Sequence, residues 1–249
     1  MSVTDTVWQT DELTQKFLSG VRGAIPLADL QIDTMLRLID RSQTAVTHFL
    51  DLGCGDGILG QAVLERYPES TGVFVDFSQP MLEAARERLG GYNGRTAFQQ
   101  IDYGQAGWPD EIADSFDVII SGYSIHHQTD ERKKEIYAEI YGLLKPGGIF
   151  VNVEHVACRS ALGEQVAEDV FVDAMVVYHQ KIGDGRTRKQ LARDLYHRYR
   201  PGGAANMLAP VEAQCDWLRQ IGFTQVDCYL QYLETAVFGG IKPEKMNHG

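Results

Sequence analysis

Short apolar runs alternate with longer segments of helical periodicity through the middle of the chain. The apolar runs are residues 47–52, 72–76, 96–101, 116–121 and 149–154. Runs of this length favour buried strands, whereas the segments between them repeat apolar positions every three or four residues, as helices do. These helical segments are residues 59–67, a stretch that Ser78 can cap and that Gly90 and Gly91 end, and residues 131–144. The alternation predicts an α/β fold with a doubly wound, mostly parallel sheet.

The segment before this alternation predicts two further helices. Residues 27–39 carry apolar side chains at helical spacing. An earlier stretch holds Trp8, Leu13, Phe17 and Leu18. We therefore expect residues 1–44 to form N-terminal cap helices outside the sheet.

We expect residues 45–249 to form one domain. Within it, residues 155–210 interrupt the alternation of strands and helices. An apolar stretch at helical spacing covers residues 166–179, and a basic stretch follows it. The interruption predicts an inserted helical cap that covers the substrate. The alternation then resumes with a helix at 211–221 and strands at 223–230 and 234–239.

A turn rich in glycine follows the first predicted strand. It reads Gly53-Cys-Gly-Asp-Gly57. Glycine in such a turn lets the backbone approach a ligand closely. Asp76 ends the second predicted strand, 25 residues after Asp51, where a carboxylate can bind both hydroxyls of a ribose. The pattern predicts a site for an adenosine-containing cofactor at the carboxyl end of the sheet.

The spacing of the glycines distinguishes between cofactors. The dinucleotide fingerprint G-x-G-x-x-G needs a third glycine at position 58, where the chain has Ile58. Asp51 and Asp56 flank the turn, and two carboxylates suit a cationic ligand better than a pyrophosphate. S-adenosyl-L-methionine carries a sulfonium and an amino group against one carboxylate. The turn therefore favours S-adenosyl-L-methionine over NAD.

Five motifs in register resemble the class I S-adenosylmethionine-dependent methyltransferases. The first is the D-x-G-x-G-x-G pattern that begins at Asp51, and the others are segments 73–76, 100–103, 116–121 and 144–149. The resemblance implies a seven-stranded, Rossmann-like sheet whose last two strands form an antiparallel hairpin. It also implies an enzyme that moves a methyl group from S-adenosyl-L-methionine to a small molecule. The acceptor atom, N, O, S or C, stays open.

The expected cofactor contacts lie at the ends of the first four strands. Asp76 is expected on the ribose, and the backbone of Ser121 beside the methionine part. The resemblance implies that Asp102 binds the adenine amino group. Phe77 and Met81 either sandwich the adenine or pack in the core. The full set of expected cofactor-binding residues is Asp51, Gly53, Cys54, Gly55, Gly57, Asp76, Phe77, Met81, Asp102, Tyr103 (through its backbone N–H) and Ser121.

Two adjacent histidines follow the fourth predicted strand. An unperturbed imidazole titrates near ~6.5, so His126 or His127 could deprotonate an acceptor, and we favour His127 as the catalytic base. The alternative is that the pair only braces the loop, because a sulfonium already activates its methyl group and positioning does most of the work. The residues expected to line the substrate pocket are Tyr123, Glu154, His155, Tyr178 and His179.

Composition narrows the class of protein. The 249 residues carry a formal net charge of −11, which disfavours nucleic acid and anionic membranes as partners. The four cysteines have no metal-ligand spacing, so we expect no metal, no disulfide framework and a cytoplasmic location. Neither a signal peptide nor a membrane helix is expected. The expected partner is a small-molecule substrate, and a homodimer is left open.

The basic stretch at residues 181–200 has two interpretations. It holds seven Lys and Arg residues against two Asp. It could bind an anionic substrate group or RNA phosphates. We favour the alternative that it forms a solvated helix face paired with acidic residues elsewhere.

Two other functions stay in competition with methyl transfer. The segment at residues 25–27 and the tail that begins at Gly222 loosely resemble carboxy-S-adenosylmethionine synthases, in which the cofactor itself is modified with prephenate. The glycine motif has the common methyltransferase form instead. The second competitor is a non-catalytic, S-adenosylmethionine-binding regulatory protein.

Overall fold

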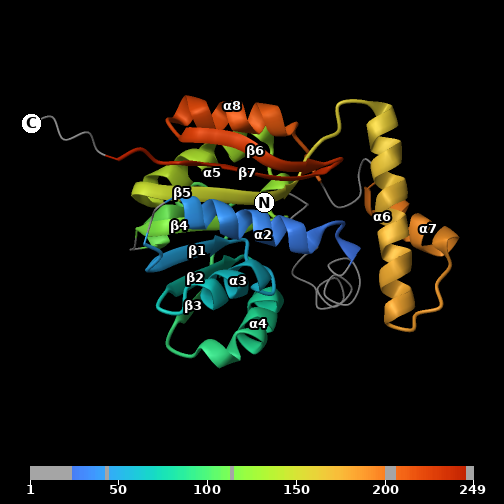
Figure 1. Ribbon diagram of the computed structural model, residues 1–249, viewed down its shortest axis with the longest axis horizontal. Helices are drawn as coiled ribbons and strands as arrows, with labels where there is room; N and C mark the ends of the chain where they lie inside the picture. The colour runs from blue at the N-terminus through green and yellow to red at the C-terminus, as the bar shows by residue number, and fades with distance from the viewer. Residues whose placement is uncertain (1–23, 43–44, 113–114, 200–205, 245–249) are drawn as a thin grey trace, which may run out of the picture.

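A seven-stranded sheet organises the computed structural model, which describes residues 24–42, 45–112, 115–199 and 206–244. The strands are β1 (His48–Leu52), β2 (Thr71–Asp76), β3 (Thr96–Gln100), β4 (Phe116–Gly122), β5 (Leu144–His155), β6 (Thr224–Tyr232) and β7 (Thr235–Ile241). Their order is β3-β2-β1-β4-β5-β7-β6, and β1 to β5 are parallel (Figure 1). β7 runs antiparallel to both β5 and β6. The predicted fold class, with its antiparallel last hairpin, is confirmed.

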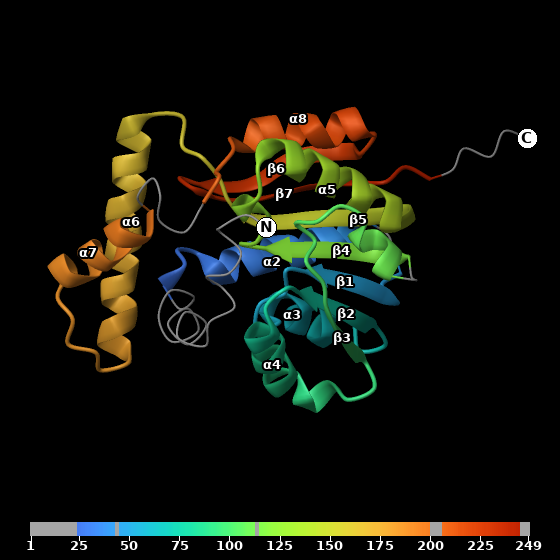
Figure 2. The same cartoon turned by 180° about the vertical axis from the view of Figure 1, so that it is seen from behind.

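Two layers of helices cover the sheet. On one face lie α2 (Ala28–Arg41), α3 (Ile58–Arg66) and α4 (Gln79–Arg88), and on the other lie α5 (Asp130–Leu143) and α8 (Val211–Ile221) (Figures 1 and 2). Both faces of the inner strands β1, β2 and β4 are therefore buried, whereas the edge strand β3 is partly exposed. This burial explains why the strands read as continuous apolar runs instead of alternating patterns.

The helix predicted over residues 27–39 is present as α2, but it packs on a face of the sheet. Met35 and Ile39 are buried in the same hydrophobic cluster as Phe49 of β1 and Val63 of α3. This helix therefore belongs to the α layer beside the sheet. The earlier expected helix with Trp8, Leu13, Phe17 and Leu18 lies outside the described residues.

The fifth strand begins earlier than its apolar run. It starts at Leu144, directly after α5, and includes residues 145–148, which lie between the predicted helix at 131–144 and the apolar run at 149–154. The Gly147 N–H donates to the Lys242 carbonyl, and the Lys242 N–H donates to the Gly148 carbonyl, each at 2.8 Å. Gly147 has φ +80°, which glycine tolerates. Pairing with the chain beyond β7 thus extends the strand.

The inserted segment forms two helices beyond the carboxyl end of β5. They are α6 (Ala161–Lys181) and α7 (Arg188–Tyr199), and both views place them outside the body of the sheet domain (Figures 1 and 2). Ser160 caps α6 by accepting the N–H of Gly163 at 3.1 Å. The two helices share a small hydrophobic cluster, formed by Val172, Met175 and Leu191, with Ala24, which precedes α2.

Acidic side chains of α6 pair with a basic residue of the stretch at 181–200. Arg188 contacts Asp173 at 2.9 Å and Asp169 at 2.8 Å. Arg186 pairs with Asp184 at 2.7 Å. This pairing supports the interpretation of a solvated helix face for the described part of the stretch. Among the described helices, none is both long and apolar enough to cross a membrane.

Gly60 allows α3 to lie against β2, and its replacement tests this contact. A Cβ atom at Gly60 would lie 2.2 Å from Cε1 of Phe74, which is fully buried. We expect Gly60→Ala to lower the free energy of unfolding by about 1–3 kcal/mol, because the ring cannot move without displacing the core. Chemical denaturation measures this change.

Gly142→Ala is the matched control for this prediction. Gly142 also lies in a helix, and a Cβ atom there would meet nothing within 4 Å. The control variant should gain about 0.5–1 kcal/mol from helix propensity. Equal stability of the two variants would contradict the proposed steric role of Gly60.

Candidate functional site

The glycine turn after β1 has the left-handed backbone that its residues permit. Gly53, Gly55 and Gly57 have φ of +67°, +54° and +78°. The Cys54 N–H donates to the Val75 carbonyl at 2.9 Å, which fixes the turn beside the end of β2. A Cβ atom at Gly53 would lie 2.0 Å from Oγ of Ser124. The turn therefore lies directly against the loop that follows β4.

Asp76 closes the same corner from the end of β2. Its Oδ2 accepts the N–H of Gly55 and its Oδ1 the N–H of Ser78, each at 2.9 Å. The backbone N–H of Phe77 also interacts with this carboxylate, which leaves part of its acceptor capacity for a ligand hydroxyl. Burial raises the pKa of the Asp76 carboxyl from 3.8 to about 6. The structure thus brings together the glycine turn and the carboxylate, as expected.

The other two aspartates of the motif have partners within the protein. Asp51 is buried, and its Oδ2 accepts the N–H of Gly60 at 2.9 Å. Asp56 pairs with Arg88 of α4 at 2.6 Å. Asp51 thereby ties the end of β1 to the first turn of α3. Gly60 is a residue that the sequence reasoning missed, and its one signal was a glycine inside an apolar helical segment.

The residues expected around the adenine lie at the ends of β2 and β3. Met81 is buried in α4, whereas Phe77 is half-buried. Asp102 is half-buried, and its Oδ1 accepts the N–H of Gly104 at 3.0 Å. The Tyr103 side chain is buried, and its hydroxyl hydrogen-bonds to Ser124 at 2.6 Å. This side chain supports the loop after β4, a role that the sequence did not indicate.

The start of the loop after β4 is tied to two neighbouring elements. Ser121 is buried and donates from its hydroxyl to the Leu52 carbonyl at 2.8 Å. Tyr123 has φ +50°, a strained conformation for a non-glycine residue that often accompanies functional sites. Its hydroxyl donates to Gln31 of α2 at 2.8 Å. Gln31 is buried, and a single polar residue on an apolar helix face was its only signal in the sequence.

The two histidines differ in their surroundings. His126 is buried, and its Nδ1 lies 2.6 Å from Glu154 Oε1. Burial lowers the pKa of His126 well below 6.5, and nearby His155 and Lys133 act in the same direction. His127 is half-buried, with its ring centroid 4.0 Å from that of His126. Of the pair, His127 is therefore the more accessible.

The residues expected around the substrate fall into two groups. Glu154 and His155 lie with the histidines at the end of β5, and His155 Nε2 contacts Glu234 at 3.0 Å. Tyr178 and His179 lie in the cap instead. His179 is buried there, with Nδ1 3.0 Å from Asp184. No group of three or more His, Cys, Asp or Glu residues in the described part of the chain could hold a metal ion.

Comparisons with known proteins identify the family of this site. Residues 49–148, which contain the glycine turn and Asp76, match a family described as "Methyltransferase domain". The chain is 29% identical over 195 residues to a trans-aconitate 2-methyltransferase of Acidovorax sp. (strain JS42), covering 73% of this chain and 70% of that protein. It is 24% identical over 226 residues to a carboxy-S-adenosyl-L-methionine synthase of Shewanella amazonensis, covering 89% and 87%.

Residues 49–148 thus form a methyltransferase domain, and the chain is similar over most of its length to enzymes of S-adenosylmethionine chemistry. The predicted family, enzyme class and cofactor, S-adenosyl-L-methionine, are confirmed. Residues 55–60 also fit the dinucleotide pattern G-x-G-x-x-G, with Gly60 as the third glycine, so the glycine spacing alone does not exclude NAD. The comparisons, and not Ile58, decide for S-adenosyl-L-methionine.

Solved structures share the fold of this methyltransferase. An O-methyltransferase family protein from Burkholderia thailandensis has a TM-score of 0.66 at 17% identity, over 97% of this chain and 63% of that one. Human N-acetylserotonin methyltransferase in complex with SAM has a TM-score of 0.56 at 16% identity, over 94% and 59%. The chain thus spans about three fifths of the length of these structures.

The raised pKa of Asp76 predicts how pH affects stability. The unfolded chain ionises this carboxyl more readily than the folded one, so its contribution to stability is greatest below pH 3.8 and is lost as pH rises through about 6. Relative to Asp76→Asn, the wild type should lose about 1 kcal/mol of unfolding free energy between pH 5 and pH 7.5. Urea denaturation at the two pH values measures this loss.

The control for this measurement is Asp216→Asn. Asp216 is exposed and pairs with Arg219 on α8 at 2.7 Å. The pH dependence of the control should match that of the wild type. A wild type and an Asp76→Asn variant with parallel pH profiles would show that burial does not perturb this carboxyl.

Proposed function

We propose that the protein transfers a methyl group from S-adenosyl-L-methionine to a small-molecule acceptor bound between the loop after β4 and the helical cap. One observation carries the proposal. Three left-handed glycines, the Asp76 carboxylate and the loop after β4 meet at the carboxyl ends of neighbouring parallel strands. Ligands of open α/β sheets bind at this edge.

The proposed cofactor position follows from the groups that line this corner. The ribose binds the Asp76 carboxylate, and the methionine part lies along Gly53 and Gly55, beside the Ser121 backbone. The adenine lies between Phe77 and Met81, with Asp102 on its amino group and the N–H of Tyr103 on its ring. Cys54 fills the space behind the turn, because its buried thiol contacts the Gly55 carbonyl.

The proposed reaction is a substitution at the methyl carbon. The acceptor atom forms a bond to this carbon while the C–S bond breaks, and the electron pair stays on sulfur as a neutral thioether. The reaction needs an acceptor in line with the C–S bond at roughly 3–3.5 Å. We assign the protein two tasks, alignment of the acceptor and exclusion of water, with His127 as the base where the acceptor carries a proton.

A small carboxylic acid is the first acceptor class to test. This choice rests on the similarity to trans-aconitate 2-methyltransferases, which extends over 70% of their length. A carboxylate is already deprotonated at neutral pH and attacks through oxygen without a base. The release of S-adenosylhomocysteine in the presence of trans-aconitate, and then of other small acids, amines and phenols, tests the proposal.

Carboxy-S-adenosyl-L-methionine synthesis is the second candidate. It is favoured by a similarity that covers 89% of this chain, more than the methyltransferase similarity covers. Mass spectrometry of the cofactor after incubation with prephenate separates the two. A mass increase of the cofactor itself would support the synthase, whereas release of S-adenosylhomocysteine with a methylated acceptor supports the methyltransferase.

Replacing Asp76 tests the proposed cofactor site. Asp76→Ala removes charge-assisted hydrogen bonds to the ribose worth roughly 1.5–3 kcal/mol, so the affinity for S-adenosylhomocysteine should fall about tenfold or more. Titration calorimetry measures the affinity. Asp216→Ala, which removes an exposed carboxylate, should bind as the wild type does. An unchanged dissociation constant in Asp76→Ala would place the ribose elsewhere.

The cap is proposed to select the acceptor, together with Tyr123 and His155 at the sheet edge. Tyr178 is half-buried beside the cap's hydrophobic cluster. With the first acceptor found, Tyr178→Ala should change turnover at least about fivefold. It should leave S-adenosylhomocysteine binding within about twofold, because Tyr178 lies in the cap and not at the proposed cofactor site. Tyr229→Ala on β6 is the control and should change neither. Equal losses of turnover and cofactor binding in Tyr178→Ala would make the cap purely structural.

A further inference from the structure

The carboxylate of Glu154 accepts three N–H groups in a site closed to solvent. Its Oε1 lies 2.6 Å from His126 Nδ1 and accepts the N–H of His155 at 2.8 Å. Its Oε2 accepts the backbone N–H of His126 at 3.1 Å. The side chain is fully buried, and burial raises the pKa of its carboxyl. Glu154 is therefore directed at the loop after β4 and is shielded from solvent.

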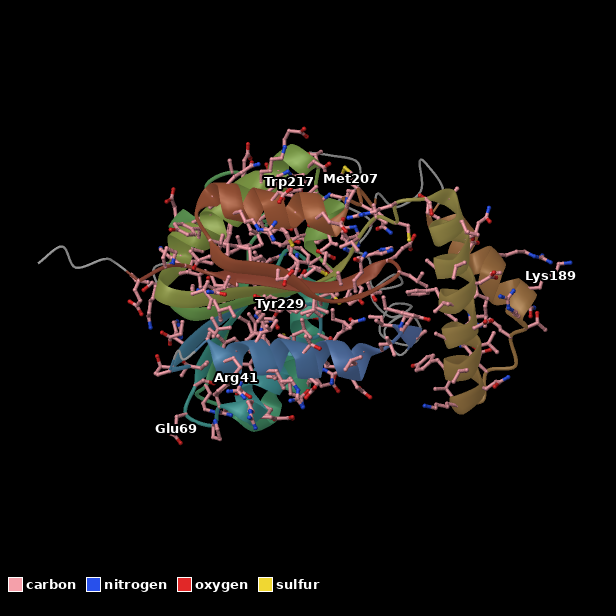
Figure 3. All side chains as sticks on the ribbon, turned by 45° about the horizontal axis from the view of Figure 1, so that its top comes forward. Arg41, Glu69, Lys189, Met207, Trp217 and Tyr229 are labelled. Carbon is pink, nitrogen blue, oxygen red and sulfur yellow. The ribbon has the colours of Figure 1, made fainter. Side chains whose placement is uncertain are left out.

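His126 extends this contact to the segment that returns from the cap. Its carbonyl accepts the N–H of Met207 at 2.9 Å, and its ring hydrogen-bonds to the Asn206 side chain. The buried Lys133 of α5 contacts the Met207 carbonyl from the other side. Figure 3 shows Met207 near the start of α8, on the side of the sheet domain that faces the cap. One histidine thus joins β5, the loop after β4 and the returning chain.

We propose that Glu154 is a positioning residue, which holds the loop after β4 and the cap's returning segment in a fixed relation through His126. Glu154 contacts neither cofactor nor acceptor in this proposal. The inference rests on the proposed function in one respect, namely that the cofactor binds against this loop. Cofactor binding is then transmitted through His126 to Met207, and so to the base of the cap.

The chemistry of the donors explains why a carboxylate is needed. Three N–H groups converge on Glu154, and a carboxylate offers only acceptor sites, whereas an amide replaces one oxygen by a donor. The titratable groups around the pair are His127, His155, Lys133, Asp130, Glu234, Tyr103 and Tyr137. Glu154→Gln keeps the shape of the side chain but cannot accept from both the ring and the backbone of His126 without a clash of donors.

Amide hydrogen exchange at Met207 tests this link, with S-adenosylhomocysteine as the probe. In the wild type, the probe should slow exchange of the Met207 amide. Glu154→Gln should bind the probe within about threefold of the wild type, yet exchange Met207 about tenfold faster and show no response to the probe. An amide of β4, such as that of Val118, reports the stability of the sheet and should not change.

Two further variants test whether the change in Met207 exchange depends on the contact between Glu154 and His126. Asn206→Ala removes the contact from the cap side without leaving a buried charge, and it should weaken the response of Met207 in the same direction. Glu212→Gln makes the same chemical change at an exposed residue that pairs with Arg159 at the entry to the cap, and it should behave as the wild type.

The inference is overturned if Met207 keeps its probe-dependent protection in both Glu154→Gln and Asn206→Ala. It is also overturned if Glu212→Gln loses that protection equally. Failure of the wild type to bind S-adenosylhomocysteine would instead refute the proposed function. In that case the exchange rates without ligand still test the link. If Glu154 holds His126 in place, the Met207 amide exchanges more slowly in the wild type than in Glu154→Gln.

Discussion

Buried carboxylates that accept backbone N–H groups hold together the edge of the sheet on which the site depends. Asp51 at the end of β1 binds the first turn of α3, Asp76 at the end of β2 binds the glycine turn, and Glu154 at the end of β5 binds the loop after β4. Each bond joins the end of a strand to the first turn of a helix or to a connecting loop. Because a buried carboxylate without donors is strongly destabilised, each of these segments is confined to the position where its N–H groups reach the oxygens.

This arrangement divides the protein into a part that suits one cofactor and a part that is free to vary. The glycine turn and Asp76 are constrained on all sides, by the close approach of Ser124 to Gly53 and by the contact of Gly55 with the carboxylate. The hydrophobic cluster of the cap joins α6 and α7 to Ala24, and Arg188 pairs with acidic residues of α6, so these contacts of the cap do not involve the strands of the sheet. Methyl transfer needs mainly alignment, so a family can change acceptors by changing what covers the sheet edge.

Most of the fold and the core of the candidate site could be predicted from the sequence, because their signals are local. Apolar runs mark strands that are covered on both faces, and the glycine turn with Asp76 marks the proposed cofactor edge. The remaining features depend on partners far along the chain. Gly60 matters because of a ring on β2, Gln31 because of a tyrosine after β4, and the early start of β5 because of pairing with Lys242. A single sequence shows neither end of such a contact as special. The expected roles of Tyr178 and of the other cap residues stay predictions.

The point where the cap leaves and rejoins the sheet domain has a consequence for the connectivity of the chain. The Ala157 N–H donates to the Ala209 carbonyl at 3.1 Å, so the excursion begins and ends at neighbouring positions. An excursion whose ends already meet adds a loop-closure entropy that grows only with the logarithm of its length. The sheet domain therefore does not depend on the cap for its chain path. Replacement of residues 158–208 by a short turn would keep every strand of the sheet and the order in which the chain connects them.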